Sequence, residues 1–263
     1  MNSSNQQQFL SNELYWELLE EAFPTVSYWK DWQIDIDMLI ELTKVMSKAK
    51  ILDIGCGTGK YSISFAKKAY QVFGWDDRKR YLKIAENNAI INKVDIQWLS
   101  QDLQLVNFPS FSFDLVTMFS CIFSYLKTEE DALFFLKKAY NFLSDQGMIL
   151  IELVGREALE SHFQQMGWIS LANDAFLLWE RKIIHELNWV NESLILIKDG
   201  VKKKCASGFR IFYTSHLLKM LEQIGFVNVK LYQDFQGSVY SEDASRLVIV
   251  AEKCNRKTIF VRG

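Results

Sequence analysis

Proline, histidine and cysteine are scarce in this chain, and none of them forms a recognisable chemical motif. Its 263 residues include 2 prolines, 3 histidines and 4 cysteines. Cys56, Cys121, Cys205 and Cys254 form no C-x-x-C pair, and no histidine stands at ligand spacing beside them. This argues against a zinc site or a disulfide framework, and reduced thiols are typical of cytoplasmic proteins. We therefore expect no metal site and a reducing compartment.

The chain also lacks an excess of positive charge and a long apolar run. Its formal net charge is −2 and its basic run is confined to residues 202–204, so no positive field favours a nucleic acid. No apolar run reaches the roughly 18 residues that span a bilayer. The N-terminal segment is polar and then acidic, unlike a signal peptide. We expect a cytoplasmic protein with no nucleic-acid or membrane partner.

What the sequence does contain is an alternation of short apolar runs with helical segments between residues 48 and 167. The apolar runs predict strands over 50–54, 71–76, 95–102, 113–119 and 148–154. The segments between them predict helices over 60–69, 78–92 and 129–143, the last closed by the turn SDQG. Such alternation is typical of an α/β protein whose parallel sheet has helices on both faces.

Different patterns flank this region. Two helices are expected over 9–23 and 31–47. After residue 168 three antiparallel strands are expected, joined at the turns VNES and KDG, and then a helix with Thr214 or Ser215 as its N-cap and Gly225 past its end. The predicted units are an N-terminal helical cap (1–47), a core (48–167), an antiparallel β insertion (168–213), the end of the core with a helix and two strands (214–253), and a tail (254–263).

The stretch ILDIGCGTGKYS, residues 51–62, places three glycines at alternate positions between a predicted strand and a predicted helix. A P-loop needs G-x-x-x-x-G-K-[ST], but Ile54 stands at its first glycine and Tyr61 at its hydroxyl residue. The dinucleotide fingerprint G-x-G-x-x-G fits only in part, because the third glycine comes one residue early. Neither phosphate motif accounts for the stretch.

The pattern that does fit is acidic-x-Gly-x-Gly-x-Gly, met by Asp53, Gly55, Gly57 and Gly59. A carboxylate at the end of the first strand would repel a pyrophosphate, whereas it can accept hydrogen bonds from an ammonium group. The glycines let the backbone approach a ligand without a Cβ clash. The loop therefore favours a ligand with a cationic, amino-acid-like part.

Two more acids follow the next two predicted strands. Asp76 comes 23 residues after Asp53, and an acid about 20 residues on can hold both ribose hydroxyls. Asp102 can accept a hydrogen bond from the exocyclic amine of adenine, and Leu103 can cover the ring. Three carboxylates at consecutive strand ends thus predict contacts to an amino acid, a ribose and an adenine.

Together with GWD, SQDL and FDLVTMFS, this stretch resembles the class I S-adenosylmethionine-dependent methyltransferases, in particular their aminosugar N-methyltransferases and glycine N-methyltransferase-like enzymes. The resemblance implies a doubly wound, Rossmann-like α/β fold with a seven-stranded sheet whose last strand is antiparallel. It also implies S-adenosylmethionine (SAM) across the carboxyl ends of the first four strands, with S-adenosylhomocysteine (SAH) as product. The predicted cofactor-binding residues are Asp53, Gly55, Gly57, Gly59, Asp76, Asp77, Asp102, Leu103 and Phe119.

Absent motifs narrow the acceptor of the methyl group. No [DNS]-P-P-[YF] follows the fourth strand, no cysteine lies in a Pro-Cys context, and no carboxylate stands between that strand and Glu129. These absences argue against base or glutamine nitrogens, cytosine C5 and metal-dependent catechol-type acceptors, and leave a small molecule. The candidate acceptor contacts are Tyr28, Trp29, Ser124, Tyr125, Arg210, Tyr213 and Arg246.

We predict a methyltransferase that acts on N or O of a small molecule, mainly by holding acceptor and methyl group in line. No catalytic base is identified from the sequence. The insertion is expected to cover the acceptor or to form a homodimer interface. Two alternatives are a SAM- or SAH-binding regulatory module without turnover and, less favoured by the loop, a nicotinamide-dependent oxidoreductase.

Overall fold

The computed structural model describes residues 13–21, 36–100, 112–171 and 174–254. Its helices are α1 (Glu13–Glu20), α3 (Ile36–Thr43), α4 (Lys60–Lys67), α5 (Lys79–Asn92), α6 (Glu129–Phe142), α7 (Arg156–Ser161) and α8 (Thr214–Ile224), with 3-10 helices η1 (Ile122–Tyr125) and η2 (His185–Leu187). Its strands are β1 (Lys50–Ile54), β2 (Gln71–Trp75), β3 (Gln97–Leu99), β4 (Phe113–Met118), β5 (Leu143–Leu153), β6 (Met166–Ser170), β7 (Phe176–Ile184), β8 (Trp189–Lys198), β9 (Val201–Arg210), β10 (Phe226–Tyr232) and β11 (Leu247–Lys253).

A seven-stranded sheet runs through the molecule in the order β10-β11-β5-β4-β1-β2-β3. The last strand, β11, is antiparallel to both of its neighbours, whereas β1, β2, β3, β4 and β5 pair in parallel. The doubly wound Rossmann-like sheet with a reversed last strand is therefore confirmed. Because parallel strands end at the same edge, the segments that follow β1, β2, β4 and β5 meet there.

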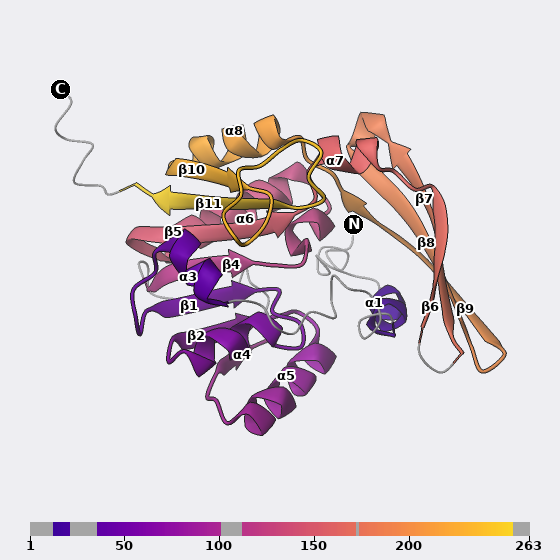
Figure 1. Ribbon diagram of the computed structural model, residues 1–263, viewed down its shortest axis with the longest axis horizontal. Coiled ribbons are helices and arrows are strands. Elements are labelled where there is room, and N and C mark those ends of the chain that lie inside the picture. The colour runs from indigo at the N-terminus through magenta and orange to yellow at the C-terminus, as the bar shows by residue number, and fades with distance from the viewer. Residues whose placement is uncertain (1–12, 22–35, 101–111, 172–173, 255–263) are drawn as a thin grey trace, which may run out of the picture.

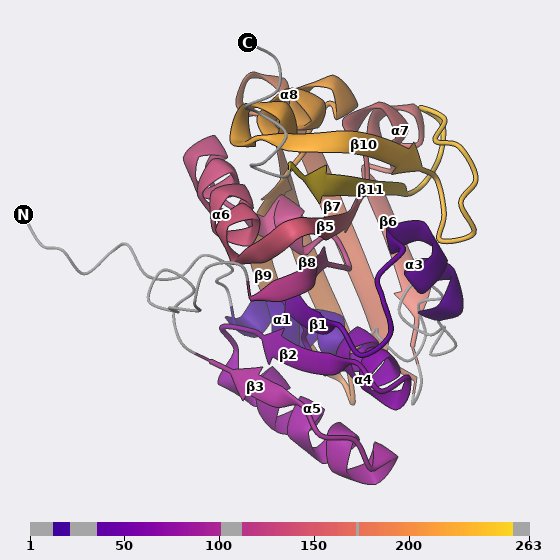
Figure 2. The same cartoon turned by 90° about the vertical axis from the view of Figure 1, so that its left-hand side faces the viewer.

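The inner strands β1, β4 and β11 are buried on both faces, which explains why they are almost continuously apolar. Side chains alternate along β1, so Ile51 and Leu52 enter different hydrophobic cores. Helices α6 and α8 cover the face that Leu52 enters, and α3, α4 and α5 cover the other (Figures 1 and 2). The cores thereby fix the strand ends on which the site is built.

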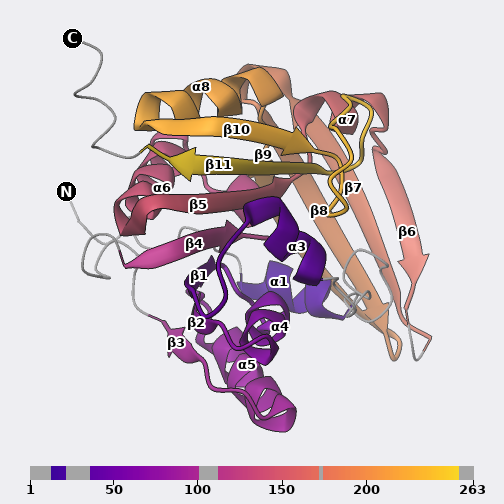
Figure 3. The ribbon, with the colours of Figure 1, turned by 60° about the vertical axis from the view of Figure 1, so that its left-hand side comes forward.

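A second sheet, with the order β6-β7-β8-β9, is antiparallel throughout. Its inner face is the one that packs on α1, where Leu177, Leu194 and Cys205 join Tyr15 and Leu18 in a third hydrophobic core. Figure 3 shows α1 between this sheet and the strands of the larger one. The second sheet thus covers the carboxyl-terminal edge of the first.

The insertion differs from its prediction in two respects. It has four strands, because β6 precedes the expected three. The turn between β7 and β8 lies at η2 and Asn188, whose φ of 49° lets the chain reverse there, while VNES lies within β8. The KDG turn is confirmed, with Asp199 and Gly200 both at positive φ between paired strands, as a two-residue hairpin requires.

Three smaller expectations are also corrected. The N-cap of α8 is Tyr213 without a side-chain hydrogen bond, because the hydroxyl of Thr214 is bound to Glu157 instead. The SDQG segment lies within β5, which begins at Leu143 rather than residue 148. Helix α7 was not expected at all.

Candidate active site

The glycine loop joins β1 to α4 and has all three glycines at positive φ: 73° at Gly55, 55° at Gly57 and 85° at Gly59. At Gly55 and Gly59 an added Cβ would collide with Ile122 and Trp98, so packing alone excludes a side chain. At Gly57 no atom of the described residues lies within 4 Å of such a Cβ. The middle glycine therefore opens onto space that a ligand can approach.

Asp53 lies in β1 with its side chain pointing toward α4. It is 1% exposed, and its carboxylate accepts hydrogen bonds from the hydroxyls of Ser62 at 2.6 Å and Thr117 at 2.9 Å. Burial raises the pKa of Asp53 to about 6, although these two hydrogen bonds oppose the shift and the nearby Asp76 adds to it. The backbone N–H of Ser62 also donates to this carboxylate, so about one of its four lone-pair positions is left for a ligand.

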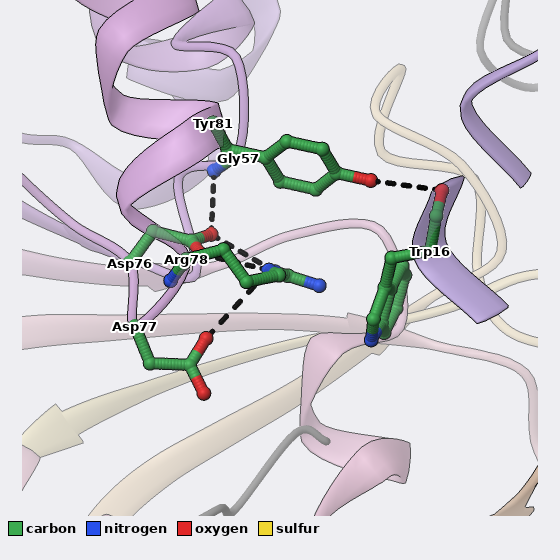
Figure 4. A network of polar contacts seen from close by, with 6 residues as sticks. All are labelled: Trp16, Gly57, Asp76, Asp77, Arg78 and Tyr81. Carbon is green, nitrogen blue, oxygen red and sulfur yellow. Dashed lines mark hydrogen bonds and ion pairs between the residues drawn. The ribbon is translucent and has the colours of Figure 1, made fainter. Parts of the chain in front are cut away.

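Asp76 follows β2 and is fully buried, and its carboxylate lies beside the guanidinium of Arg78 (Figure 4). Its Oδ1 accepts from the backbone N–H of Arg78 at 3.0 Å and from the guanidinium Nε at 2.8 Å. Its Oδ2 accepts from the backbone N–H of Gly57 and from the guanidinium Nη2, both at 2.9 Å. Asp76 is thus tied to the middle of the glycine loop and to one arginine.

The guanidinium of Arg78 is itself covered by aromatic rings. Its Cζ lies 4.2 Å from the ring centroid of Trp16 in α1 and 4.6 Å from that of Tyr81 in α5. The hydroxyl of Tyr81 donates to the carbonyl of Trp16 at 3.2 Å. Burial works against the charge of Arg78, but the adjacent Asp76 outweighs it and raises the pKa of the guanidinium.

Of the other predicted cofactor contacts, two lie within the described residues. Asp77 is partly buried beside Arg78, with 3.6 Å between its Oδ1 and Nε, and burial raises its pKa to about 6. Phe119 is buried after β4, stacked on Tyr61 with 3.7 Å between ring centroids. Asp102 and Leu103 lie outside the described residues.

A cavity of about 180 Å³, which we call the acceptor cavity, lies beyond the ends of β4 and β5. It is lined by Tyr15, Leu19, Cys121, Ser124, Tyr125, Val154, Leu159, Arg181, Glu192, Phe209 and Ile211. These residues come from α1, from the segments after β4 and β5, and from the inner face of the second sheet. Most of the lining is apolar, as in small-molecule sites.

A polar cluster crosses this apolar lining. Arg181 and Glu192 are directly opposite each other on β7 and β8, with 2.5 Å between Nε and Oε1. The other oxygen of Glu192 accepts a hydrogen bond from the hydroxyl of Tyr15, which lies 3.4 Å from the hydroxyl of Tyr125. Burial, with the nearby charge of Glu192, holds the pKa of both tyrosines above the ordinary value, so both hydroxyls stay protonated.

The predicted acceptor contacts fall into three groups. Ser124 and Tyr125 line the acceptor cavity, where the sequence placed them. Arg210 donates to the carbonyl of Lys127 at 2.8 Å, and the half-exposed Tyr213 stacks under Arg156. Neither these two nor Arg246 lines the cavity.

Arg246 instead forms an ion pair with the buried Glu152, with 2.9 Å between Nε and Oε1. The two remaining predicted acceptor contacts, Tyr28 and Trp29, lie outside the described residues. The structure therefore describes the positions of five of the seven side chains, and their roles stay predictions.

Sequence reasoning missed Tyr15, Arg181 and Glu192. A signal for the last two exists, because Arg181 in β7 and Glu192 in β8 lie an even number of residues from the buried Leu177 and Leu194, on the same inner face of the sheet. A charged residue at an inward-facing position of an otherwise apolar strand face indicates a specific partner or a site. The partner of Tyr15 lies 177 residues away in sequence, and no local pattern reveals it.

Comparison with known proteins supports a methyltransferase, as the glycine loop and the acids after the strands predict. A family described as "Methyltransferase domain" matches residues 51–147. "Putative methyltransferase GWCH70_2453" from Geobacillus sp. (strain WCH70) is 24% identical over 253 residues, which is 88% of this chain and 100% of that protein.

Two solved structures share the fold. The S-adenosylmethionine-dependent methyltransferase from Clostridium acetobutylicum ATCC 824 has a TM-score of 0.76 at 17% identity, covering 92% of this chain and 100% of that one. The SAM-bound amino pentose methyltransferase CalS10 from Micromonospora echinaspora has a TM-score of 0.69 at 14% identity, covering 94% and 99%.

The chain therefore carries a methyltransferase domain on a Rossmann-like sheet. The family match and the curated relative make it a methyltransferase, and its fold is the fold of S-adenosylmethionine-dependent methyltransferases, which supports SAM as the cofactor. Among the described residues no helix is long and apolar enough to cross a membrane.

Three observations fit this cofactor to the carboxyl-terminal edge of the sheet. The backbone at Gly57 faces open space, and Asp76 is held beside it by two backbone N–H groups. Among the described residues, two buried polar atoms of the same network have no hydrogen-bond partner, namely Oδ1 of Asp77 and Nη1 of Arg78. Buried polar atoms are normally satisfied, so a polar ligand that rearranges this network would relieve them.

Proposed function

We propose that this enzyme transfers the methyl group of SAM to a nitrogen or oxygen of a small molecule in the acceptor cavity. The observation that carries the proposal is that η1 contacts both sites. Ile122 of η1 packs against Gly55 in the glycine loop, whereas Ser124 and Tyr125 of the same turn line the cavity. A methyl donor on the loop and an acceptor in the cavity would therefore meet across η1.

In the proposed SAM site, each residue binds a different part of the cofactor. Asp53 accepts hydrogen bonds from the cationic amino group, and Asp76 accepts them from the ribose hydroxyls. Gly57 gives the backbone close access. SAM supplies a methyl group that its sulfonium has already activated. Asp77, Asp102, Leu103 and Phe119 stay predictions for further cofactor contacts.

On the acceptor side, the chain's own residues position the acceptor and exclude water. An apolar lining keeps the cavity dry, and the hydroxyls of Ser124, Tyr125 and Tyr15 orient a polar group within it. Because both tyrosines stay protonated, they act as hydrogen-bonding groups and not as phenolate bases. A neutral amine needs no base to attack, which suits this arrangement. The likeness to an amino pentose methyltransferase supports an amine acceptor.

The test is the affinity for SAM of Asp76→Ala, measured by isothermal titration calorimetry. We expect binding at least about 100-fold weaker, since two charge-assisted hydrogen bonds are lost. Asp114→Ala is the matched control, because Asp114 lies at the opposite edge of the sheet and contacts Lys50 and Ser144. Unchanged SAM binding by Asp76→Ala would remove the ribose assignment.

Turnover is tested separately, by incubating the protein with methyl-labelled SAM and a panel of small amines and alcohols. Labelled product from an amine or alcohol supports the proposal. SAM binding without any labelled product across the panel would favour the regulatory module instead. The domain boundaries and the homodimer that the sequence predicts also stay predictions. Analytical ultracentrifugation tests the dimer.

A further inference from the structure

The carboxylate assigned to the ribose already has all of its hydrogen-bonding positions filled. A carboxylate offers about four lone-pair sites. Asp76 uses two for the backbone N–H groups of Gly57 and Arg78, and two for Nε and Nη2 of the Arg78 guanidinium. The ribose diol of SAM needs two of these sites. The backbone donors are fixed by the loop and by the start of α5, so only the guanidinium can leave.

We propose that Arg78 is a displaceable occupant of the ribose subsite, and that its release couples cofactor binding to α1. The inference rests on the proposed function, because it takes Asp76 as the ribose ligand. Arg78 is then a positioning residue that opposes SAM until the ribose replaces it. It also accounts for the unsatisfied Nη1, since the guanidinium is held by its other nitrogens in a place that does not complete its hydrogen bonds.

The coupling to α1 follows from what covers the guanidinium. Trp16 of α1 stacks on it at 4.2 Å, so a guanidinium that leaves Asp76 also leaves this ring (Figure 4). The neighbouring residue of α1, Tyr15, reaches the acceptor cavity and binds Glu192. One short helix therefore contacts the occupant of the ribose subsite with one residue and the acceptor cavity with the next.

The first test is the affinity for SAH of the full-length protein carrying Arg78→Met. Methionine keeps an unbranched apolar stem but cannot hydrogen-bond to Asp76, which retains its two backbone donors. We expect SAH to bind about tenfold more tightly than to the wild type, because the competing occupant is gone. A residue that merely supported the loop would give weaker binding when removed. Equal or weaker binding by Arg78→Met overturns the proposal.

Arg80→Met is the matched control. Arg80 also ties α5 to α1, through Glu17 at 3.3 Å and Glu20 at 3.1 Å, but it does not contact Asp76. Its substitution should loosen α1 and leave SAH affinity within twofold. If Arg80→Met tightens SAH binding as much as Arg78→Met does, the effect belongs to α1 in general and the proposal is wrong.

A second readout is backbone hydrogen exchange in α1. SAH should speed exchange over residues 13–20 of the wild type while slowing it at the glycine loop, and in Arg78→Met the α1 rate should not respond. Slower or unchanged exchange in wild-type α1 on SAH binding overturns the coupling. Should Arg78→Met fail to fold, Trp16→Leu removes the stacked ring and leaves Asp76 untouched, and it should tighten SAH binding about threefold.

The two levels of proposal fail in different ways. If Asp76→Ala binds SAH as well as the wild type does, the ribose assignment is wrong and this inference falls with it. If Asp76→Ala binds SAH weakly and Arg78→Met binds no more tightly than the wild type, only the displacement of Arg78 is overturned.

Discussion

The two halves of the site place buried charge in different ways. At the edge of the seven-stranded sheet, Asp53 and Asp76 lie at or just after strand ends, where backbone N–H groups and hydroxyls of the adjacent loop and helix reach them. On the inner face of the four-stranded sheet, Arg181 and Glu192 lie within strands whose backbone groups are already paired. The first arrangement is local, whereas the second depends on a cross-strand partner. The two halves should therefore respond differently to the loss of one charge.

The largest loss of stability on removing one charge is expected in the four-stranded sheet. Arg181→Met leaves the carboxylate of Glu192 at 3% exposure with Tyr15 as its remaining partner. We expect a loss of about 3 kcal/mol in the free energy of unfolding, because removing one member of a buried ion pair leaves an uncompensated charge. Chemical denaturation of the purified protein measures it.

Glu192→Gln is the matched variant. It leaves the guanidinium of Arg181, whose side chain is 32% exposed, free to be hydrated. Its cost should be no more than about 1.5 kcal/mol, since the amide keeps a hydrogen bond with Tyr15. Equal losses in the two variants would contradict the idea that the buried carboxylate is the costly partner.

The local half was largely predictable from the sequence, and for a physical reason. The strands of the parallel sheet are apolar on both faces, and the glycines, Asp53 and Asp76 are fixed by their distance along the chain from those strands. Spacing is therefore sufficient to place them at one edge. The same reasoning placed Ser124 and Tyr125 after β4, and both line the acceptor cavity.

The other half was not predictable in the same way. Tyr15 meets Glu192 across 177 residues, and this pair exists only because the second sheet folds over the edge of the first. Arg78 is a different case, since it lies two residues from Asp76 and its competition with the ribose follows from hydrogen-bond geometry. Arg210 and Arg246 stay predicted acceptor contacts, but they bind the carbonyl of Lys127 and the carboxylate of Glu152 and do not line the cavity.

Gly57→Ala separates loss of stability from loss of cofactor binding at the edge of the seven-stranded sheet. An alanine here has a positive φ of 55° and no clash, so the free energy of unfolding should fall by only about 1 kcal/mol. SAH binding should weaken about 30-fold, because the Cβ enters the space through which the backbone approaches the cofactor. Calorimetric titration and denaturation separate the two effects.

Gly200→Ala supplies the control. Gly200 also has a positive φ, 72°, and no atom of the described part of the chain lies within 4 Å of an added Cβ, but it lies in a hairpin turn of the second sheet. It should show the same loss of stability and unchanged SAH affinity. If SAH affinity falls in both variants, the effect at Gly57 reflects backbone strain and not contact with the cofactor.

The ionisation of Asp53 should make SAH affinity depend on pH. An ionised carboxylate binds the ammonium group, and with a pKa of about 6 only about a tenth of the molecules carry it at pH 5. Affinity should therefore rise about tenfold between pH 5 and pH 7. Asp53→Asn should abolish the rise, whereas Asp77→Asn should keep it, although the pKa of Asp77 is also raised to about 6.

Stability should change in the opposite direction over the same range. The folded-state pKa of Asp53 lies above its ordinary value of 3.8, so its contribution to stability is fully present below about pH 4 and is lost as the pH rises through about 6. At pH 7 Asp53→Asn should therefore be more stable than the wild type and bind SAH more weakly. A variant less stable than the wild type at pH 7 would contradict the burial of this charge.

The smallest effect is expected at the N-terminus of α6, the helix that follows η1. Thr128 and Asp131 form a capping box at the start of α6, in which the Thr128 hydroxyl accepts from the Asp131 N–H at 3.0 Å and the Asp131 carboxylate from the Thr128 N–H at 3.1 Å. Thr128→Ala should cost about 1 kcal/mol of stability.

Thr128 lies three residues after Tyr125, but neither side chain of the box lines the acceptor cavity, so SAH affinity should stay within twofold. Thr128→Ser keeps the acceptor oxygen and should restore most of the loss. A fall in SAH affinity together with stability would mean that η1 takes its position from α6 rather than from the glycine loop.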